Sequence, residues 1–152
     1  MNKLKSISQI AKIVLQLKKA NKKIVFTNGC FDILHIGHIR LLKKAKSLGD
    51  ILVVGLNSDK SVKKIKGNKR PIIPENERAQ ILSAVSSVDF ILKFSQPTPY
   101  NLIKKIKPDI LVKGADWKEE KIVGSEFAKK VVRIPLVKGY STTGIIQKLK
   151  NI

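Results

Sequence analysis

The stretch that decides the fold is KIVFTNGCFDILHIGHIRLLKKAKSLG, residues 23–49. Its first part, KIVFTN at residues 23–28, is a short apolar run typical of a buried strand. Its last part, from Gly37 to Gly49, is predicted to be a helix that ends at the second of these glycines. A strand that leads through a glycine-containing turn into a helix favours a parallel α/β fold.

The same alternation continues along the chain. Further strands are predicted at residues 50–57, 88–94, 109–114 and 131–137, and further helices at residues 6–20, 75–87, 98–107, 118–130 and 142–152. Because each predicted strand is a short continuous apolar run, the sheet should be parallel and covered on both faces. We therefore expect one α/β domain with a five-stranded parallel sheet and helices on both faces.

Local signals predict some boundaries. Ser6 and Gln9 are spaced for a capping box, and Thr98 with Pro99 should begin the helix at residues 98–107. Residues 58–74 are basic and interrupted by glycine and proline, so they are predicted to be a long loop, mobile and able to close over a bound ligand. Residues 1–22 should form a helix that packs on a domain at residues 23–152.

Composition narrows the class of protein. The chain has 152 residues, 43% of them hydrophobic, which suits one folded domain. The single cysteine, Cys30, cannot form an intrachain disulfide, and no apolar run reaches the ~20 residues of a membrane span. The basic N-terminus lacks the apolar core of a signal peptide. We therefore expect a cytoplasmic protein without a membrane partner.

The net charge of +20 attracts anions such as nucleic acid, anionic lipid or phosphorylated metabolites. The lysines are spread along the whole chain, and few aromatic residues are present to stack on bases. Nucleic acid is therefore an unlikely partner on this composition. A basic nucleic-acid-binding module without catalysis is still kept as an alternative.

Ligands of parallel α/β sheets bind at the carboxyl ends of the strands. The segment after the first predicted strand contains both histidines of the chain, His35 and His38. Gly37 and His38 should lie at a helix N-terminus, which attracts anions, and Gly29 lets the backbone approach a ligand closely. Two imidazoles there can donate hydrogen bonds to phosphate oxygens and stabilise the charge of a transferring phosphoryl or nucleotidyl group.

Two other interpretations of the histidines stay open. They could hold a metal ion, although no cysteine or glutamate completes a zinc-like spacing. They could also be ordinary loop and cap residues, which is common for an isolated pair of this spacing. The strand before the pair, the helix after it and the flanking glycines favour the phosphate interpretation.

The stretch GCFDILHIGH, residues 29–38, resembles the H-x-G-H signature of the nucleotidyltransferase superfamily. Residues 27–50, 54–82, 110–124 and 140–149 are similar to the branch that adenylates heptose 1-phosphate. The resemblance covers nearly the whole chain and implies a Rossmann-like nucleotidyltransferase domain. In that branch the domain is often the C-terminal half of a protein whose other half is a sugar kinase, so the stand-alone form is expected here.

The resemblance also implies a set of functional residues. His35, His38 and Lys66 would be catalytic. The residues expected to bind the nucleotide or the phosphates come from the turn after the first strand, the segment after the second, the segment beside the nucleoside and the N-terminus of the last helix: Asn28, Gly29, Cys30, Phe31, Asp32, Gly37, Asn57, Asp59, Lys63, Arg70, Lys113, Gly114, Asp116, Trp117, Ser141, Thr142 and Thr143.

Several of these residues have structural alternatives. Asp32 could brace its own turn, and Ser141 or Thr142 could cap the last helix without any ligand. Lys63 and Lys66 could be plain surface lysines. Arg78, which is not in the expected set, should make a structural ion pair, and Cys30 should be a small buried residue and not a nucleophile.

The function implied is transfer of AMP from ATP to D-glycero-D-manno-heptose 1-phosphate, giving ADP-heptose and pyrophosphate. ATP and Mg²⁺ are the implied cofactors, no protein metal site is expected, and a homodimer is expected from superfamily relatives. Cytidylyltransferases carry an arginine shortly before their STT motif, whereas residues 135–143, PLVKGYSTT, contain only Lys138. This departure favours adenylyl transfer. A cytidylyl- or adenylyltransferase for glycerol 3-phosphate, FMN or a similar phosphorylated alcohol stays open.

Overall fold

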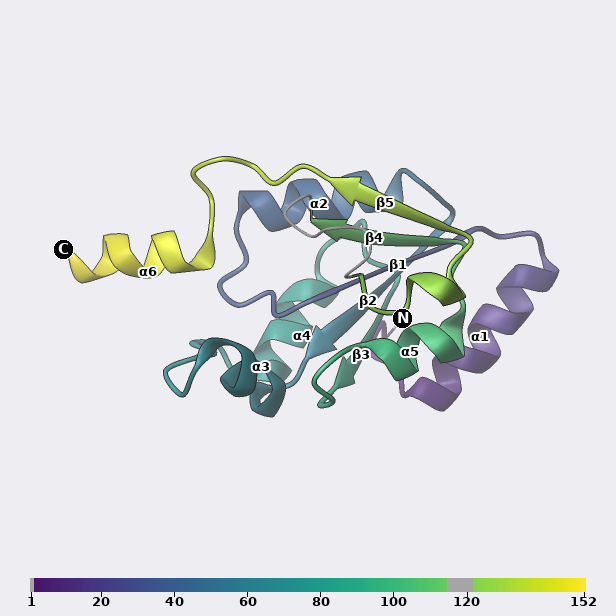
Figure 1. Cartoon of the computed structure of the whole chain (residues 1–152), viewed down its shortest axis with the longest axis horizontal. Coiled ribbons are helices and arrows are strands. Elements are labelled where there is room, and N and C mark those ends of the chain that lie inside the picture. Colours follow the sequence, from purple (N-terminus) through teal and green to yellow (C-terminus); the bar gives the residue numbers. More distant parts are fainter. Residues whose placement is uncertain (1, 115–121) are drawn as a thin grey trace.

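The computed structural model describes residues 2–114 and 122–152 (Figure 1). These residues form a five-stranded parallel sheet with the strand order β3-β2-β1-β4-β5. The strands are β1 (Ile24–Gly29), β2 (Ile51–Asn57), β3 (Phe90–Phe94), β4 (Ile110–Gly114) and β5 (Lys130–Ile134). The helices are α1 (Ile7–Lys19), α2 (Ile36–Lys46), α3 (Asp59–Lys66), α4 (Glu75–Ser83), α5 (Tyr100–Ile106) and α6 (Thr142–Lys150), with a short 3-10 helix η2 (Ser125–Phe127).

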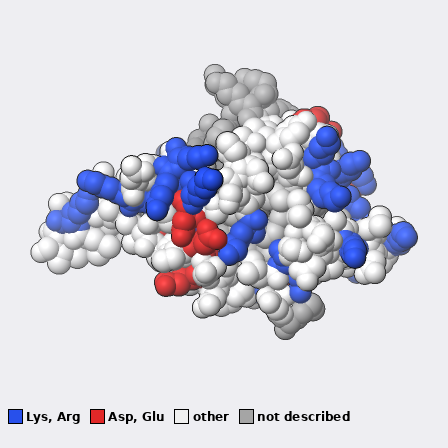
Figure 2. Space-filling model, turned by 90° about the horizontal axis from the view of Figure 1, so that it is seen from below, with Lys and Arg blue, Asp and Glu red and all other residues white. Residues whose placement is uncertain are grey.

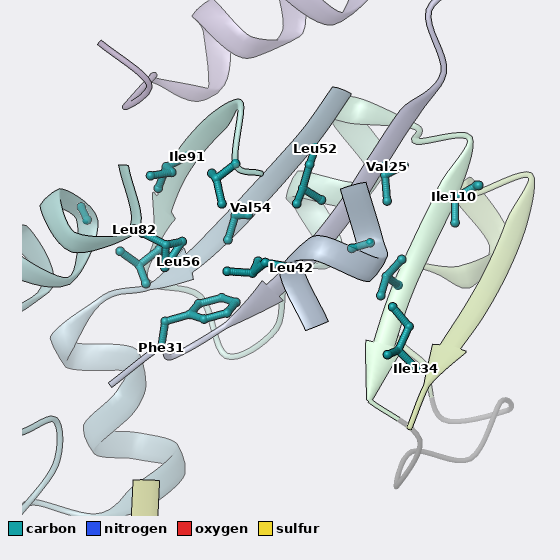
Figure 3. Packing of buried hydrophobic residues seen from close by; sticks show 14 residues of the cluster. Val25, Phe31, Leu42, Leu52, Val54, Leu56, Leu82, Ile91, Ile110 and Ile134 are labelled. Atoms are coloured by element: carbon teal, nitrogen blue, oxygen red, sulfur yellow. The ribbon is translucent and has the colours of Figure 1, made fainter. Parts of the chain in front are cut away.

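Helices cover both faces of the sheet. Side chains of successive strand residues point to opposite faces, so each apolar strand presents apolar side chains to the helices on both sides. Val25 of β1, Leu42 of α2 and Leu82 of α4 belong to one core cluster (Figure 3). The next residue, Phe26, packs on the other face with Ile103 of α5 and with buried residues of α1. The predicted fold class, with helices on both faces of a parallel sheet, is therefore confirmed.

The predicted capping box of α1 is confirmed, since Gln9 N donates to Ser6 Oγ and Ser6 N donates to Gln9 Oε1. The prediction of Thr98 as a helix cap is wrong. Helix α5 begins at Tyr100, and Pro99 occupies the capping position without a side-chain bond. Strand β5 ends at Ile134, before Pro135, which has no N–H group to continue the pairing of the sheet.

The predicted long loop at residues 58–74 is wrong for residues 59–66, which form α3. Ser58 caps this helix by accepting from Ser61 N, and the fully buried Val62 anchors it on the sheet. The helix ends at Gly67, whose φ of 96° favours glycine. The polar composition misled the prediction because most lysines of α3 lie on its exposed side. Closure of this region over a ligand stays a prediction.

The predicted helix at residues 118–130 is wrong over its described part, residues 122–130. That part contains only η2, and β5 already begins at Lys130. Gly124 has a φ of 81°, which is outside the helical region, and a Cβ there would lie 2.8 Å from Ile103 Cδ1. Close packing on α5 therefore interrupts the helix at Gly124.

The direction in which successive strands are added to the sheet reverses between β1 and β4. The chain builds β2 and β3 on one side of β1, and then β4 and β5 on the other side. Ligand crevices of α/β sheets lie at such a switch point. No helix within residues 2–114 and 122–152 has the length and the apolar composition needed to cross a bilayer.

Candidate active site

A cavity of about 630 Å³ lies at the carboxyl edge of the sheet, where the switch point predicts a ligand. It brings together most of the residues expected from the sequence. Those that line it are Asn28, Gly29, Cys30, Phe31, Asp32, His35, Gly37, His38, Asn57, Lys66, Arg70, Lys113, Gly114, Ser141, Thr142 and Thr143. Asp59 and Lys63 are not among the lining residues, and Asp116 and Trp117 lie outside the described residues.

Sequence reasoning missed part of the lining. Pro97, Thr98 and Pro99 follow β3, and Leu136 and Val137 lie between β5 and α6. The rule of the carboxyl edge also selects the segment after β3, whereas residues 136–137 were expected to belong to the strand predicted at residues 131–137. Their proline and apolar character concealed them, because the search concentrated on polar and glycine-rich stretches.

The side chains of both histidines accept backbone hydrogen bonds at the N-terminus of α2. Gly37 N donates to His35 Nδ1 at 3.1 Å, and His35 N donates to His38 Nδ1 at 3.3 Å. The rings stack with their centroids 3.8 Å apart. Because Nδ1 of each neutral ring accepts a hydrogen bond, the ring proton lies on Nε2. Each histidine can therefore offer an Nε2–H group to a ligand.

Both histidines are neutral at pH 7. Burial lowers the pKa of His38 to about 4, and the neighbouring His35 contributes in the same direction. Burial also lowers the pKa of His35 below its ordinary value. A phosphate group near Nε2 would raise both pKa values, because a nearby negative charge favours the imidazolium form. Without a ligand the neutral histidine pair can therefore donate hydrogen bonds, and it can gain positive charge when an anion enters the cavity.

Among residues 2–114 and 122–152, no group of three or more His, Cys, Asp or Glu side chains is arranged to hold a metal ion. The alternative that the histidines bind a metal therefore finds no third ligand in the described part of the chain. Their role as caps of α2 is real, and it is compatible with phosphate binding, since both occur at a helix N-terminus.

Asp32 braces the histidine turn. Its Oδ2 accepts from Arg70 Nε at 2.8 Å and from Ile72 N at 2.9 Å, and its Oδ1 accepts from Ile73 N at 3.0 Å. Burial alone would raise the pKa of Asp32, but these donors outweigh it and hold the pKa below its ordinary value. Phe31 and Ile33, on either side, have φ values of 46° and 52°. Strain of this kind persists where surrounding contacts hold it, and here Asp32 supplies them.

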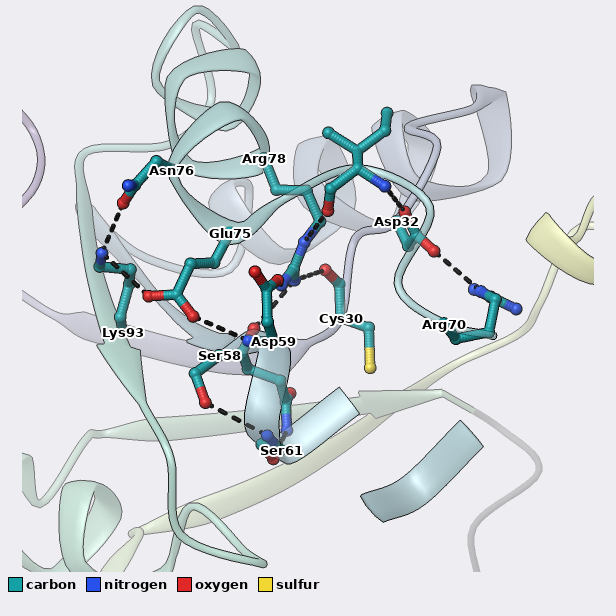
Figure 4. A network of polar contacts seen from close by, with 12 residues as sticks. Cys30, Asp32, Ser58, Asp59, Ser61, Arg70, Glu75, Asn76, Arg78 and Lys93 are labelled. Atoms are coloured by element: carbon teal, nitrogen blue, oxygen red, sulfur yellow. Dashed lines mark hydrogen bonds and ion pairs between the residues drawn. The ribbon is translucent and has the colours of Figure 1, made fainter. Parts of the chain in front are cut away.

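Arg78 connects the turn after β1 to α3 (Figure 4). Its guanidinium is fully buried and donates to the carbonyl oxygens of Cys30, Asn57 and Ile73 and to Asp59 Oδ1. The predicted structural ion pair of Arg78 is confirmed. The same ion pair engages the carboxylate of Asp59, which is not among the residues that line the cavity.

Positive groups reach the cavity from separate elements. Lys66 comes from the last turn of α3, Arg70 from the segment that follows, and Lys113 from the end of β4. Cys30 also faces the cavity, and burial raises the pKa of its thiol in spite of the nearby Lys66. A protonated thiol is a poor nucleophile, as expected from the sequence, but Cys30 is only half-buried, because it lies in the cavity wall.

The second motif enters at the N-terminus of α6. Ser141 caps this helix by accepting from Gly144 N at 2.9 Å, and Thr142 Oγ1 donates to the backbone oxygen of Asp32 at 2.6 Å. The capping role expected for Ser141 is therefore confirmed. The threonine bond attaches α6 to the histidine turn and completes the cavity wall.

Similar proteins of known sequence were found over nearly the whole chain. The bifunctional protein HldE of Campylobacter concisus is 55% identical over 150 residues, which cover 99% of this chain and 31% of that protein. The bifunctional protein HldE of Helicobacter pylori strain J99 is 54% identical over 145 residues, or 95% of this chain and 31% of that protein. The chain thus spans about a third of the length of these relatives.

Similar solved structures were also found. The lipopolysaccharide core biosynthesis protein from Thermoplasma volcanium aligns with a TM-score of 0.63 and 32% identity, over 77% of this chain and 99% of that one. The pantoate-beta-alanine ligase from Francisella tularensis aligns with a TM-score of 0.64 and 21% identity, over 98% of this chain and 78% of that one, and shares the fold.

The model of the family described as Cytidylyltransferase-like matches residues 26–148, from the third residue of β1 to the last turn of α6. The matched range includes both histidines, the turn after β1 and the threonine motif. Together with relatives that share more than half of their aligned residues with it, this match shows that the chain belongs to the Cytidylyltransferase-like family.

Proposed function

We propose that this chain transfers AMP from ATP to D-glycero-D-manno-heptose 1-phosphate, releasing pyrophosphate and ADP-heptose. The observation that carries the proposal is the pair of imidazole Nε2–H groups at the N-terminus of α2, inside a cavity at the switch point of the sheet. The motif resemblance to heptose 1-phosphate adenylyltransferases and the likeness to proteins named HldE support the choice of substrates.

The proposed reaction is a direct displacement. A phosphate oxygen of the sugar 1-phosphate attacks the α-phosphorus of ATP and forms a new P–O bond, while the bond from the α-phosphorus to the pyrophosphate oxygen breaks. No covalent enzyme intermediate is required, which agrees with the raised pKa of Cys30. Catalysis then consists of positioning the two substrates and stabilising charge.

Different residues of this chain have different roles in the proposed mechanism. His35 and His38 donate hydrogen bonds to phosphate oxygens and become more positive as charge accumulates. The positive end of the α2 helix dipole acts on the same oxygens. Lys66 and Arg70 contribute positive charge, and Arg70 is held in place by Asp32. The remaining lining residues form the proposed binding surface for the nucleotide.

The chain itself offers a poor donor set for Mg²⁺, which favours carboxylate and water oxygens. Asp32 is already bonded to Arg70 and to backbone donors, and Asp59 is paired with Arg78. Within the described residues we therefore assign no Mg²⁺ ligand. The proposal treats Mg²⁺ as part of the substrate, carried in by the phosphates of ATP.

Three broader expectations belong to the same proposal. Use of ATP and a single reduced cysteine favour a cytoplasmic location. A homodimer is supported by the superfamily resemblance. Nucleic acid as a partner is disfavoured, because the Lys and Arg side chains on the face in Figure 2 form several groups separated by neutral and acidic surface.

The test is a pyrophosphate-release assay that crosses four nucleoside triphosphates with a panel of phosphorylated sugars and alcohols. We expect turnover with ATP and D-glycero-D-manno-heptose 1-phosphate. Turnover only with CTP, or only with glycerol 3-phosphate or FMN, would replace the proposed substrates. Absence of pyrophosphate release with every pair, together with salt-dependent DNA or RNA binding, would overturn the enzyme proposal.

The histidine pair provides a second check on the mechanism. His38→Asn keeps a side-chain oxygen that can accept from His35 N, but it removes the imidazole. We expect turnover to fall by about 10²–10³-fold with unfolding behaviour retained. Turnover close to that of the unchanged protein would exclude the assigned role.

A further inference from the structure

The backbone pairing between β1 and β4 is short. Within the described residues, the paired positions are Val25 with Ile110 and Phe26 with Leu111, whereas β1 and β2 pair along all of β1. Beyond that point side chains connect the two strands. Thr27 Oγ1 donates to Val112 O at 3.1 Å, and Lys113 Nζ donates to Asn28 Oδ1. The strands thus separate at the switch point, and Lys113 lies where they separate.

Lys113 is an unusual lysine of this chain. Most of the chain's lysines lie at the surface, but Lys113 is largely enclosed and lines the cavity. Burial lowers its pKa to about 8. A buried ammonium group is costly unless a negative group or several acceptors compensate it. Its described partner, the Asn28 amide, is neutral.

Carboxylates of the described residues do not supply this compensation. Asp32, which shares the cavity, is bonded to Arg70 and to the backbone of Ile72 and Ile73. A structural link between β1 and β4 does not require a cation either, since the neutral Thr27 hydroxyl already provides one. The arrangement is better suited to an anionic group that enters the crevice.

We propose that Lys113 is a phosphate-binding residue, which exchanges its bond to Asn28 for a phosphate oxygen of a bound substrate. This inference rests on the proposed function and deepens it, because the motif resemblance places Lys113 only in a segment beside the nucleoside. The phosphate could belong to ATP or to the sugar 1-phosphate. The shared chemistry is an N–H donor from a lysine to an anionic oxygen, and the experiment separates the two sources.

The test compares Lys113→Met with a matched control, Lys18→Met. Lys18 is also a lysine whose pKa is lowered by burial, and it also bonds neutral oxygens, namely those of Ile106 and Lys107. It lies on α1 and is not among the residues that line the cavity. Methionine keeps the aliphatic part of either lysine. Replacing a buried charge by an apolar group of similar size is often neutral for stability, so Lys113→Met should fold.

Isothermal calorimetry of each variant with ATP, adenosine and D-glycero-D-manno-heptose 1-phosphate gives binding without turnover. For Lys113→Met we expect affinity to fall by about tenfold or more for one phosphate compound, while adenosine binding is unchanged. Loss confined to ATP assigns the lysine to ATP phosphates, and loss confined to the sugar phosphate assigns it to the acceptor. Lys18→Met should bind all of them like the unchanged protein.

The inference is overturned if Lys113→Met binds both phosphate compounds normally, or if it loses adenosine to the same extent as ATP. The second result would place the lysine at the nucleoside. Thermal unfolding of both variants shows whether a loss of binding affinity results from loss of stability. Binding is measured directly and does not depend on turnover. If the protein does not react with heptose 1-phosphate, the titrations with ATP and adenosine therefore still test the role of Lys113.

Discussion

The turn after β1 and the segment around α6 meet at Asp32, but they are held in very different ways. The turn is held by buried charged groups. The carboxylate of Asp32 accepts a hydrogen bond from Arg70, and the guanidinium of Arg78 donates one to the carbonyl oxygen of Cys30. By contrast, none of the nine described residues of α6 is buried, and the helix extends away from the sheet (Figure 1). Its N-terminus is attached through Thr142. The turn that is proposed to bind phosphate is therefore prearranged, whereas the α6 wall depends on few contacts.

The largest effect should come from removing the buried support of the turn. Arg78→Leu leaves the carbonyl groups of Cys30, Asn57 and Ile73 without their donor, so we expect a loss of about 3 kcal/mol or more in the free energy of unfolding. Urea denaturation measures it. The exposed Arg40→Leu on α2 is the control and should change stability by less than about 0.5 kcal/mol. Equal effects of the two variants would contradict the comparison.

The next effect concerns pH and the histidine pair. The folded pKa of His38 is about 4 and the unfolded value is about 6.5, so the unfolded chain binds the proton first as pH falls. The contribution of His38 to stability is therefore complete above about pH 6.5 and is lost between about pH 6.5 and 4, by about 1.4 kcal/mol for each pKa unit. An NMR titration of the imidazole resonances should give the low midpoint, and a midpoint near 6 would show that the turn is open.

Asp32→Asn should have a smaller effect, about 2 kcal/mol, because it removes the charge that holds Arg70 but keeps an acceptor. The folded pKa of Asp32 is lowered, so its contribution is present above the ordinary aspartate pKa and is lost as pH falls through the folded value. The unfolding energy of the variant should therefore depend less on pH below about 4 than that of the unchanged protein. The same pH dependence in both proteins would contradict this role.

Two lysines of α3 test whether position or general charge matters. Lys66 lines the cavity, whereas Lys63, one turn earlier, is not among the lining residues. If ATP binds as proposed, Lys66→Ala should lower kcat/KM by about tenfold or more, and Lys63→Ala should have little effect. Both variants change the net charge equally. Similar losses in pyrophosphate release would mean that only the overall positive field matters.

The smallest effect is expected at the α6 wall. Thr142→Val removes one hydrogen bond to Asp32 and should change the free energy of unfolding by at most about 1 kcal/mol. Hydrogen exchange should nevertheless become faster in the first turn of α6, because that attachment is lost. If the variant destabilises the whole protein as much as Asp32→Asn does, α6 is more firmly integrated than its exposure indicates.

Sequence patterns predicted the five strands and the edge of the sheet at which the cavity lies, because both depend on local signals. Alternating apolar runs identified the strands, and the predicted family resemblance was confirmed. Errors occurred where packing overrides composition. Val62 buries one side of a lysine-rich helix that was predicted to be a loop, and the packing of Ile103 on Gly124 interrupts a predicted helix.

By itself, the sequence determined that this is a parallel α/β domain with two histidines at the helix after the first strand. Short-range periodicity and spacing are sufficient for that, since strands, helix starts and motifs extend over a few residues. Only the tertiary structure decided how the charged groups are used. Asp32 and Asp59 meet Arg70 and Arg78, which are 38 and 19 residues away, and Lys113 becomes enclosed where β1 and β4 separate. Burial and charge pairing arise only when distant segments pack together, and no local pattern contains them.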